Sequence, residues 1–116
     1  MAARGSDLVE PLQRLGAKRV EATLLAVLLK EGSQGTKEIV EGTGLRQPEV
    51  SVGMQVLRDR GWVEAEAIPR RGKGRPMHKY RLVVEPQEIR KYFEAEGKKE
   101  IEAYKQAVQV LKERLG

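Results

Sequence analysis

The chain has no cysteine and a single histidine, His78, among its 116 residues. Without cysteine it can form neither disulfide bonds nor the thiolate metal sites of zinc and iron–sulfur proteins. One histidine is also too few for a histidine-rich metal site. We therefore expect no bound metal and no cofactor.

Long apolar runs are missing as well. The apolar stretch 22–29 is far shorter than the roughly 18–20 residues that span a bilayer, and it lies too far from the N-terminus for a signal peptide. We therefore expect no membrane partner and a cytoplasmic location. Asparagine is absent, which is typical of thermophiles and favours an archaeal source, although GC-rich codon usage gives the same result.

Positive charge is concentrated in one short segment. The net charge is +5, yet residues 1–67 sum to −1 and residues 82–116 to zero. Residues 68–81 contain six Lys or Arg and no acidic residue. Such a confined excess is typical of a polyanion contact, and the alternative is a solvated surface loop.

Apolar periodicity predicts three helices and a leading helix in the first half of the chain. The leading helix covers residues 7–15, and the second covers residues 18–30 with Val20, Leu24, Val27 and Leu28 inward and Leu25 and Leu29 widening that stripe. Thr36 is expected to cap a short helix, which ends at Gly42 and Gly44. Leu45 then lies in a tight turn. The third helix runs over residues 47–60, with Pro48 at its first position.

Two alternating segments, 62–68 and 77–84, predict strands that the basic segment joins as a hairpin. From residue 86 onward the pattern is helical, and Gly97 is expected to bend or break it. Five residues of this helix follow a heptad spacing and are called the seam below: Ile101, Tyr104, Val108, Leu111 and Leu115.

This order of elements predicts a mainly α fold with a small β-hairpin, a winged helix-turn-helix. The boundaries we expect are a leading helix or arm at 1–16, a DNA-binding domain at 17–84 and a C-terminal dimerisation helix at 85–116. The third helix would enter the major groove, and the basic hairpin tip would reach the neighbouring backbone or minor groove.

Two family resemblances accompany this pattern. Residues 42–63 resemble the helix-turn-helix of ArsR-type regulators, and the segment 72–82, GKGRPMHKYRL, resembles the wing of archaeal TrmB-like regulators. The matching positions in the helix-turn-helix are Leu45, Gln47, Pro48, Val50, Ser51, Leu57, Gly61 and Val63. The resemblance implies DNA binding. It does not carry over metal sensing, since the cysteines are missing, or the sugar-binding domain of the large TrmB proteins, for which we expect no room.

A helical projection of the third helix separates a core face from a DNA-facing side. The core face holds Val50, Gly53, Met54 and Leu57. The DNA-facing candidates are Gln47, Pro48, Ser51, Val52 and Gln55. Glutamine amides can pair with adenine, a serine hydroxyl with a base or phosphate, and a valine with a thymine methyl, although Val52 can equally be a stray surface residue.

Arginines and lysines supply the expected backbone contacts. On the helices, the candidates for phosphate binding are Arg46, Arg58 and Arg60, with solvated surface arginines as the alternative. At the hairpin, Arg70, Arg71 and Lys73 form what we call the wing cluster, and Lys79 follows on the second strand. Arg75, within a Gly-Arg-Pro sequence that resembles AT-hook peptides, is expected in an A·T minor groove, or on a phosphate.

The seam predicts a homodimer, because five apolar heptad positions on a monomer would otherwise remain exposed. Leu8 and Leu12 of the leading helix are expected to pack on it. The alternative is that the C-terminal helix folds back on its own domain.

The function we predict is a sequence-specific regulator of transcription that binds double-stranded DNA as a homodimer and is nucleoid-associated. One alternative is an architectural chromatin protein with little sequence preference, and another is a winged helix that binds proteins. We expect no enzymatic activity, since no glycine-rich phosphate loop follows a strand and no carboxylate pair lies in an evident cleft. The operator, the sign of regulation and any effector stay open.

Overall fold

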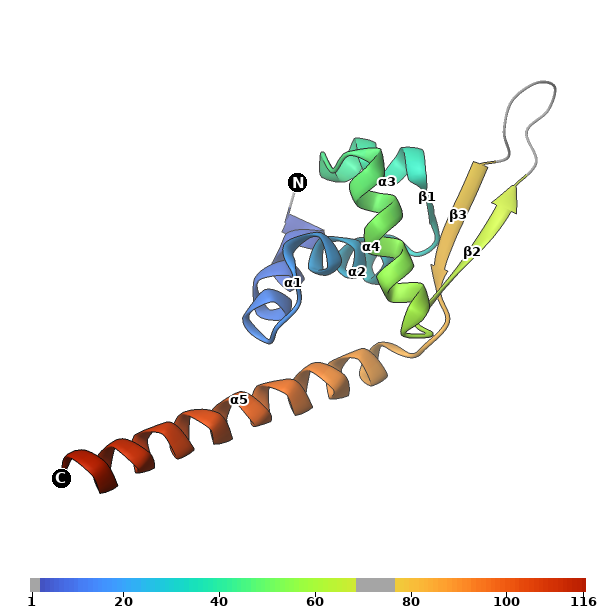
Figure 1. The fold of residues 1–116 in the computed structure, drawn as a ribbon. Helices are drawn as coiled ribbons and strands as arrows, with labels where there is room; N and C mark the ends of the chain where they lie inside the picture. Colours follow the sequence, from blue (N-terminus) through green and yellow to red (C-terminus); the bar gives the residue numbers. More distant parts are fainter. Residues whose placement is uncertain (1–2, 69–76) are drawn as a thin grey trace.

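The computed structural model describes residues 3–68 and 77–116, and its elements follow the predicted order (Figure 1). The helices in this part of the chain are α1 (Ala3–Arg14), α2 (Arg19–Glu31), α3 (Thr36–Thr43), α4 (Gln47–Asp59) and α5 (Pro86–Leu115). The strands are β1 (Gln34–Gly35), β2 (Val63–Ile68) and β3 (Met77–Leu82). The mainly α winged helix-turn-helix is thus confirmed.

The sheet has one strand more than the sequence predicts. β1 pairs antiparallel with β3, and β3 pairs antiparallel with β2, so that the order is β1-β3-β2. The register places Ala65 of β2 and Gln34 of β1 on either side of Tyr80. A two-residue strand has no alternation to detect in sequence, which is why β1 escaped prediction.

The start of α3 also differs from the prediction. Gly35, and not Thr36, precedes the helix as its cap, and its backbone N–H donates to Oε1 of Glu38 at 2.6 Å. Glu38 thereby satisfies an N–H group that would otherwise lack a partner at this helix end. A Cβ on residue 35 would lie 2.5 Å from that same carboxylate oxygen, so glycine is needed for the contact.

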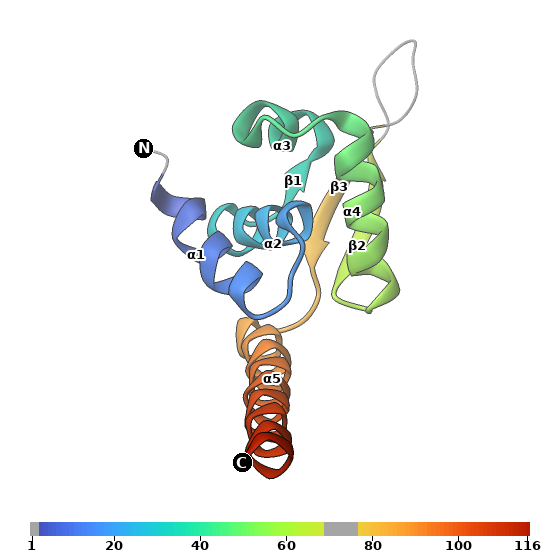
Figure 2. The same ribbon diagram turned by 60° about the vertical axis from the view of Figure 1, so that its left-hand side comes forward.

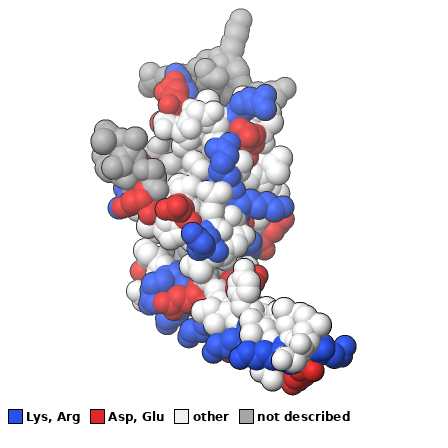
Figure 3. Space-filling view, turned by 90° about the vertical axis from the view of Figure 1, so that its left-hand side faces the viewer, with Lys and Arg blue, Asp and Glu red and all other residues white. Residues whose placement is uncertain are grey.

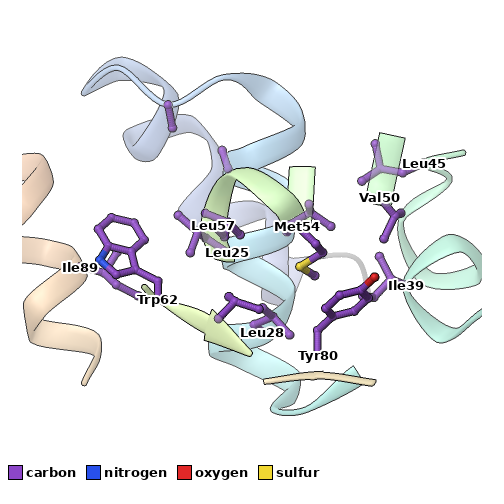
Figure 4. Packing of buried hydrophobic residues seen from close by; sticks show 14 of the residues in the cluster. Leu25, Leu28, Ile39, Leu45, Val50, Met54, Leu57, Trp62, Tyr80 and Ile89 are labelled. Carbon is purple, nitrogen blue, oxygen red and sulfur yellow. The ribbon is translucent and has the colours of Figure 1, made fainter. Parts of the chain in front are cut away.

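The core forms where α2, α4 and the sheet meet (Figure 4). Its largest fully buried side chains are Leu24, Leu25, Ile39, Val50, Met54, Leu57 and Ile89. The inward face of α2 is therefore centred on Leu24 and Leu25, whereas the predicted stripe residues Val20 and Val27 are only partly buried. A helical projection shows which side chains lie on the same side of α2. It does not show how deeply the surrounding elements bury each of them.

α5 is one continuous helix, and the predicted bend at Gly97 is wrong. A Cβ at Gly97 would lie 2.7 Å from Cδ2 of Leu15, so this glycine lets α1 approach α5 closely instead of interrupting the helix. Only the first part of α5 joins the core, through Ile89 and Phe93.

Beyond residue 97 the helix projects away from the body (Figures 1 and 2). The described chain measures 73 × 29 × 24 Å with a radius of gyration of 18.1 Å, against about 13 Å for a compact domain of this length. All residues from 101 to 116 are exposed. The alternative in which the helix folds back on its own domain is thus wrong.

Candidate DNA-binding surface

The turn between α3 and α4 fixes the start of the recognition helix. Gly44 has a φ of 78°, which closes α3, and Leu45 inserts its side chain into the core of the domain. The backbone N–H of Arg46 donates to Oε1 of Glu49 at 2.9 Å. Pro48 is the second helical residue instead of the first, still within the first turn, where its missing N–H costs nothing.

α4 has the two faces expected from its sequence. Val50, Gly53, Met54 and Leu57 are buried, so the predicted core face is confirmed. Gly53 permits a close helix crossing, since a Cβ there would lie 2.5 Å from Cδ1 of Leu24 in α2. Every α4 residue that we expect at DNA is exposed: Gln47, Pro48, Ser51, Val52, Gln55 and Arg58.

Two features of the exposed face were not foreseen. Nε2 of Gln55 donates to Oδ1 of Asp59 at 2.8 Å, which restrains the glutamine amide one helical turn away. Val56 is also 40% exposed and lies one turn after Val52, which is 67% exposed. Periodicity could have indicated the Gln55–Asp59 pair, because side chains four residues apart are neighbours on a helix.

The wing begins as a regular hairpin. Residues 63–68 of β2 pair one to one with residues 82–77 of β3, and the paired strands run from the end near α5 away from it (Figure 1). The wing cluster and Arg75 lie in the segment that connects the two strands, outside the described residues.

On the described strands, acidic residues face basic ones. Arg81 forms an ion pair with Glu64 at 2.8 Å, and Lys79 stands opposite Glu66 in the register. The base of the hairpin is therefore close to neutral in charge, and the predicted basic excess falls on the connecting segment.

Arg60 contacts two aromatic rings and a buried carboxylate of its own domain. Its guanidinium lies 5.1 Å from the ring centroids of both Trp62 and Tyr92, and its Nη2 is 3.0 Å from Oε2 of the buried Glu21. These contacts restrain an arginine that is still exposed at the surface, so its role as a phosphate contact stays a prediction. Trp62, at the root of the wing, packs edge-on against Tyr92 and Phe93 of α5.

The seam is uncovered along its whole length. The exposed fractions of its five residues run from 51% at Val108 to 78% at Leu115. Leu12 of α1 packs at the edge of the domain's own core, and Leu8 lines a groove with Leu12 and Leu15. The described residues therefore offer a large apolar surface for a partner, continuous with α1.

Other kinds of site find no support in the part of the chain that the structure describes. Residues 3–68 and 77–116 hold no group of three or more His, Cys, Asp or Glu that could bind a metal ion. Among those same residues, no helix is both long and apolar enough to cross a membrane.

Residues 12–86, more than half of the chain, match the family described as "Sugar-specific transcriptional regulator TrmB". The chain belongs to the TrmB family. No curated protein matches the sequence of this TrmB-family protein. Its ArsR-type resemblance and its archaeal source stay predictions.

Solved structures of similar fold are also regulators. A crystal structure described only as a transcriptional regulator has a TM-score of 0.59 at 15% identity, with 96% of this chain and 75% of that chain covered. A MarR family regulator from Neisseria meningitidis has a TM-score of 0.53 at 17% identity, covering 94% and 70%. A possible transcriptional regulatory protein from Mycobacterium bovis has a TM-score of 0.50 at 22% identity, covering 98% and 100%. At these identities the likeness establishes the fold alone.

Family membership settles the broad class of the TrmB-family protein. It is a DNA-binding transcriptional regulator and not an enzyme.

Proposed function

We propose that this protein is a sequence-specific transcription regulator that binds double-stranded DNA as a homodimer in the cytoplasm. α4 enters the major groove, and the wing lies on the adjacent minor groove or backbone. The observation that carries the proposal is the exposed face of α4. It presents hydrogen-bonding amides and a hydroxyl beside apolar groups, which is the chemistry that base edges require.

In this proposal, four side chains of α4 recognise the DNA bases. Gln47 and Gln55 pair with adenine, Ser51 bonds a base or a phosphate, and Val52 contacts a thymine methyl. The Gln55–Asp59 hydrogen bond supports the role of Gln55, because the amide NH₂ has a second hydrogen free for adenine N7. Pro48, exposed in the first turn of α4, borders the same surface.

Backbone contacts come from the residues around this face. Arg46 and Arg58 bind phosphates beside α4, and the wing cluster with Lys79 binds phosphates along the wing. Arg75 inserts into the minor groove. Within α4 itself the acidic Glu49 and Asp59 outnumber the basic Arg58, so the wing supplies most of the electrostatic attraction.

In this proposal, each of the three segments of the chain has its own function. Residues 17–84 bind DNA, residues 85–116 dimerise through the seam, and residues 1–16 with Leu8 and Leu12 add to the dimer surface. A dimer binds two half-sites, which raises both affinity and specificity above those of a single DNA-binding domain.

Footprinting on genomic fragments tests sequence specificity. We expect discrete protected sites, whereas uniform protection would make the protein an architectural one.

Gln55→Ala should cost about 1–3 kcal/mol of binding free energy at one base pair and relax the sequence preference there. The matched control is Gln109→Ala, since Gln109 makes the same hydrogen bond four residues along α5, to Glu113 at 3.1 Å. Equal weakening at every site would instead make Gln55 a backbone contact.

A further inference from the structure

The seam of α5 runs into the chain's own α1. Gly97 lies four residues before Ile101 and so occupies the same side of the helix, one turn nearer the body. Leu15 rests on that position, within 2.7 Å of where a Cβ would be. On the body side of Gly97, the equivalent positions hold Glu94 and Arg90, which form an ion pair at 2.9 Å. The apolar seam that a partner can reach therefore extends from Ile101 to the C-terminus.

On the other side of Leu15 lies a groove whose lining includes the charged Lys30, Arg90 and Glu94 as well as apolar residues. It has a volume of about 610 Å³ and lies between α1, the end of α2 and the start of α5. Its apolar walls are formed by Leu8, Pro11, Leu12, Leu29, Ile89 and Phe93. Figure 3 shows Lys and Arg mainly along one edge of α5, with largely uncharged surface on the side toward the body.

This placement of α1 decides how a second α5 can approach. Packed helices lie 8–10 Å apart, and a helix with its side chains is about 10–12 Å wide. In a parallel pair, Leu15 of both copies, with the chain segment that carries it at the end of α1, would have to fit between the two α5 helices at the level of Gly97, where there is no room. In an antiparallel pair, each α1 lies beyond the end of the partner's α5.

We propose that two copies of the chain pair antiparallel along α5, with the C-terminal end of each helix against α1 of the other. The inference rests on the proposed homodimer and adds its orientation and register. Ile101 lies opposite Leu111 of the second copy, Tyr104 lies opposite its Val108, and its Leu115 meets Gly97 and Leu15. This register gives every seam residue an apolar neighbour, whereas a shift by one heptad leaves Ile101 facing solvent.

The charges flanking the seam distinguish the two orientations. In the antiparallel pair Glu100 lies beside Arg114 of the second copy, and in a parallel pair it lies beside Lys105. On the other flank, the antiparallel pair brings Lys98 near Lys112 and Lys105 near its own equivalent. All of these flanking side chains are exposed, so each attraction and each repulsion is small, and the charges report the orientation instead of determining it.

The antiparallel dimer places its two DNA-binding surfaces far apart. In this register the two-fold axis passes near residue 106, about 30 Å along the helix from Pro86 at 1.5 Å per residue. The starts of the two α5 helices are then about 60 Å apart. Each DNA-binding domain lies at one of these two ends, so we expect the half-sites of a single operator to be separated by more than one turn of DNA, which is about 34–36 Å.

Cysteine cross-linking tests the orientation directly, because the native chain contains no cysteine. Ile101→Cys and Leu111→Cys are each made alone, and both positions are exposed, so the fold should tolerate them. After the two variants are mixed, allowed to exchange subunits and oxidised, we expect a disulfide between them, while neither variant cross-links alone. Cross-linking of each variant with itself would establish a parallel dimer and overturn the proposal. A chain that sediments as a monomer would instead overturn the proposed homodimer.

Charge reversal gives a second, independent readout. Arg114→Glu should weaken the dimer about tenfold in sedimentation experiments, because it turns two attractions into two repulsions. Lys105→Glu is the matched control and should leave the dimer unchanged, since it exchanges one like pair for another. The opposite pattern, with Lys105→Glu weakening the dimer and Arg114→Glu without effect, would show a parallel pair and refute the inference.

Discussion

The crossing of α2 and α4 depends on the absence of a side chain at Gly53. A Cβ at this position would lie 2.5 Å from Cδ1 of Leu24 and 2.9 Å from Cγ1 of Val20. Leu24 is fully buried, so it cannot move aside without displacing the rest of the core. Overpacking a core in this way costs about 1–3 kcal/mol.

The same substitution also has a favourable term. Alanine is better than glycine inside a helix by roughly 0.5–1 kcal/mol. Overpacking is the larger of the two effects at this position. We therefore expect Gly53→Ala to lower the free energy of unfolding by about 0.5–2 kcal/mol, and to weaken DNA binding because it displaces α4.

Two other glycines, Gly42 and Gly97, also lie in helices and serve as controls, because an added Cβ meets fewer atoms there than at Gly53. At Gly42 in α3 an added Cβ meets nothing within 4 Å, so Gly42→Ala should stabilise the protein by about 0.5–1 kcal/mol. At Gly97 the added Cβ meets only the tip of Leu15, which is partly exposed and can change its rotamer. In Gly97→Ala, the gain from the higher helix propensity of alanine and the cost of the contact with Leu15 should therefore nearly cancel.

Urea unfolding followed by circular dichroism measures this series. All variants are compared at one protein concentration, because dimerisation makes the apparent stability depend on concentration. The expected order of stability is Gly42→Ala, then Gly97→Ala, then Gly53→Ala. If Gly53→Ala were stabilised as much as Gly42→Ala, the close approach of α2 and α4 would be refuted.

Three further perturbations test other parts of the molecule. Val108→Asp with Leu111→Asp should yield a monomer in sedimentation with near-native helical content and without tight operator binding, since buried unpaired charges cost several kcal/mol each; a variant that remains dimeric would place the interface elsewhere. Changing the whole wing cluster to alanine should weaken binding to every DNA sequence and reduce the salt slope by about 0.9 per lost phosphate contact, and an unchanged slope would exclude those residues as ligands. Glu21→Gln should destabilise the fold by about 1–3 kcal/mol, because it leaves Arg60 without its ion pair. The exposed pair is the control, and Glu64→Gln should change unfolding by less than about 1 kcal/mol.

Local sequence patterns were sufficient to predict most of the elements and the candidate surface. The apolar spacing in residues 47–60 separated buried Val50 and Met54 from exposed Val52 and Gln55, because 3.6 residues per turn assigns each position a direction. The glycine after α3 marked the turn, since only a residue that tolerates positive φ closes a helix so sharply. The heptad spacing of the seam is visible in the sequence for the same reason, because a regular helix places residues three and four apart on one side.

Contacts between distant segments were decided only by the tertiary structure. The strand β1 exists because β3 lies beside it, and no pattern within two residues can reveal that neighbour. Arg60 is an exposed arginine, but only the fold brings Glu21 of α2 and Tyr92 of α5 into contact with it. Helix propensity predicts a break at Gly97 because propensity is a property of one residue in one helix. Its actual role depends on Leu15, 82 positions earlier in the sequence, which only the packing of α1 on α5 brings into contact with it.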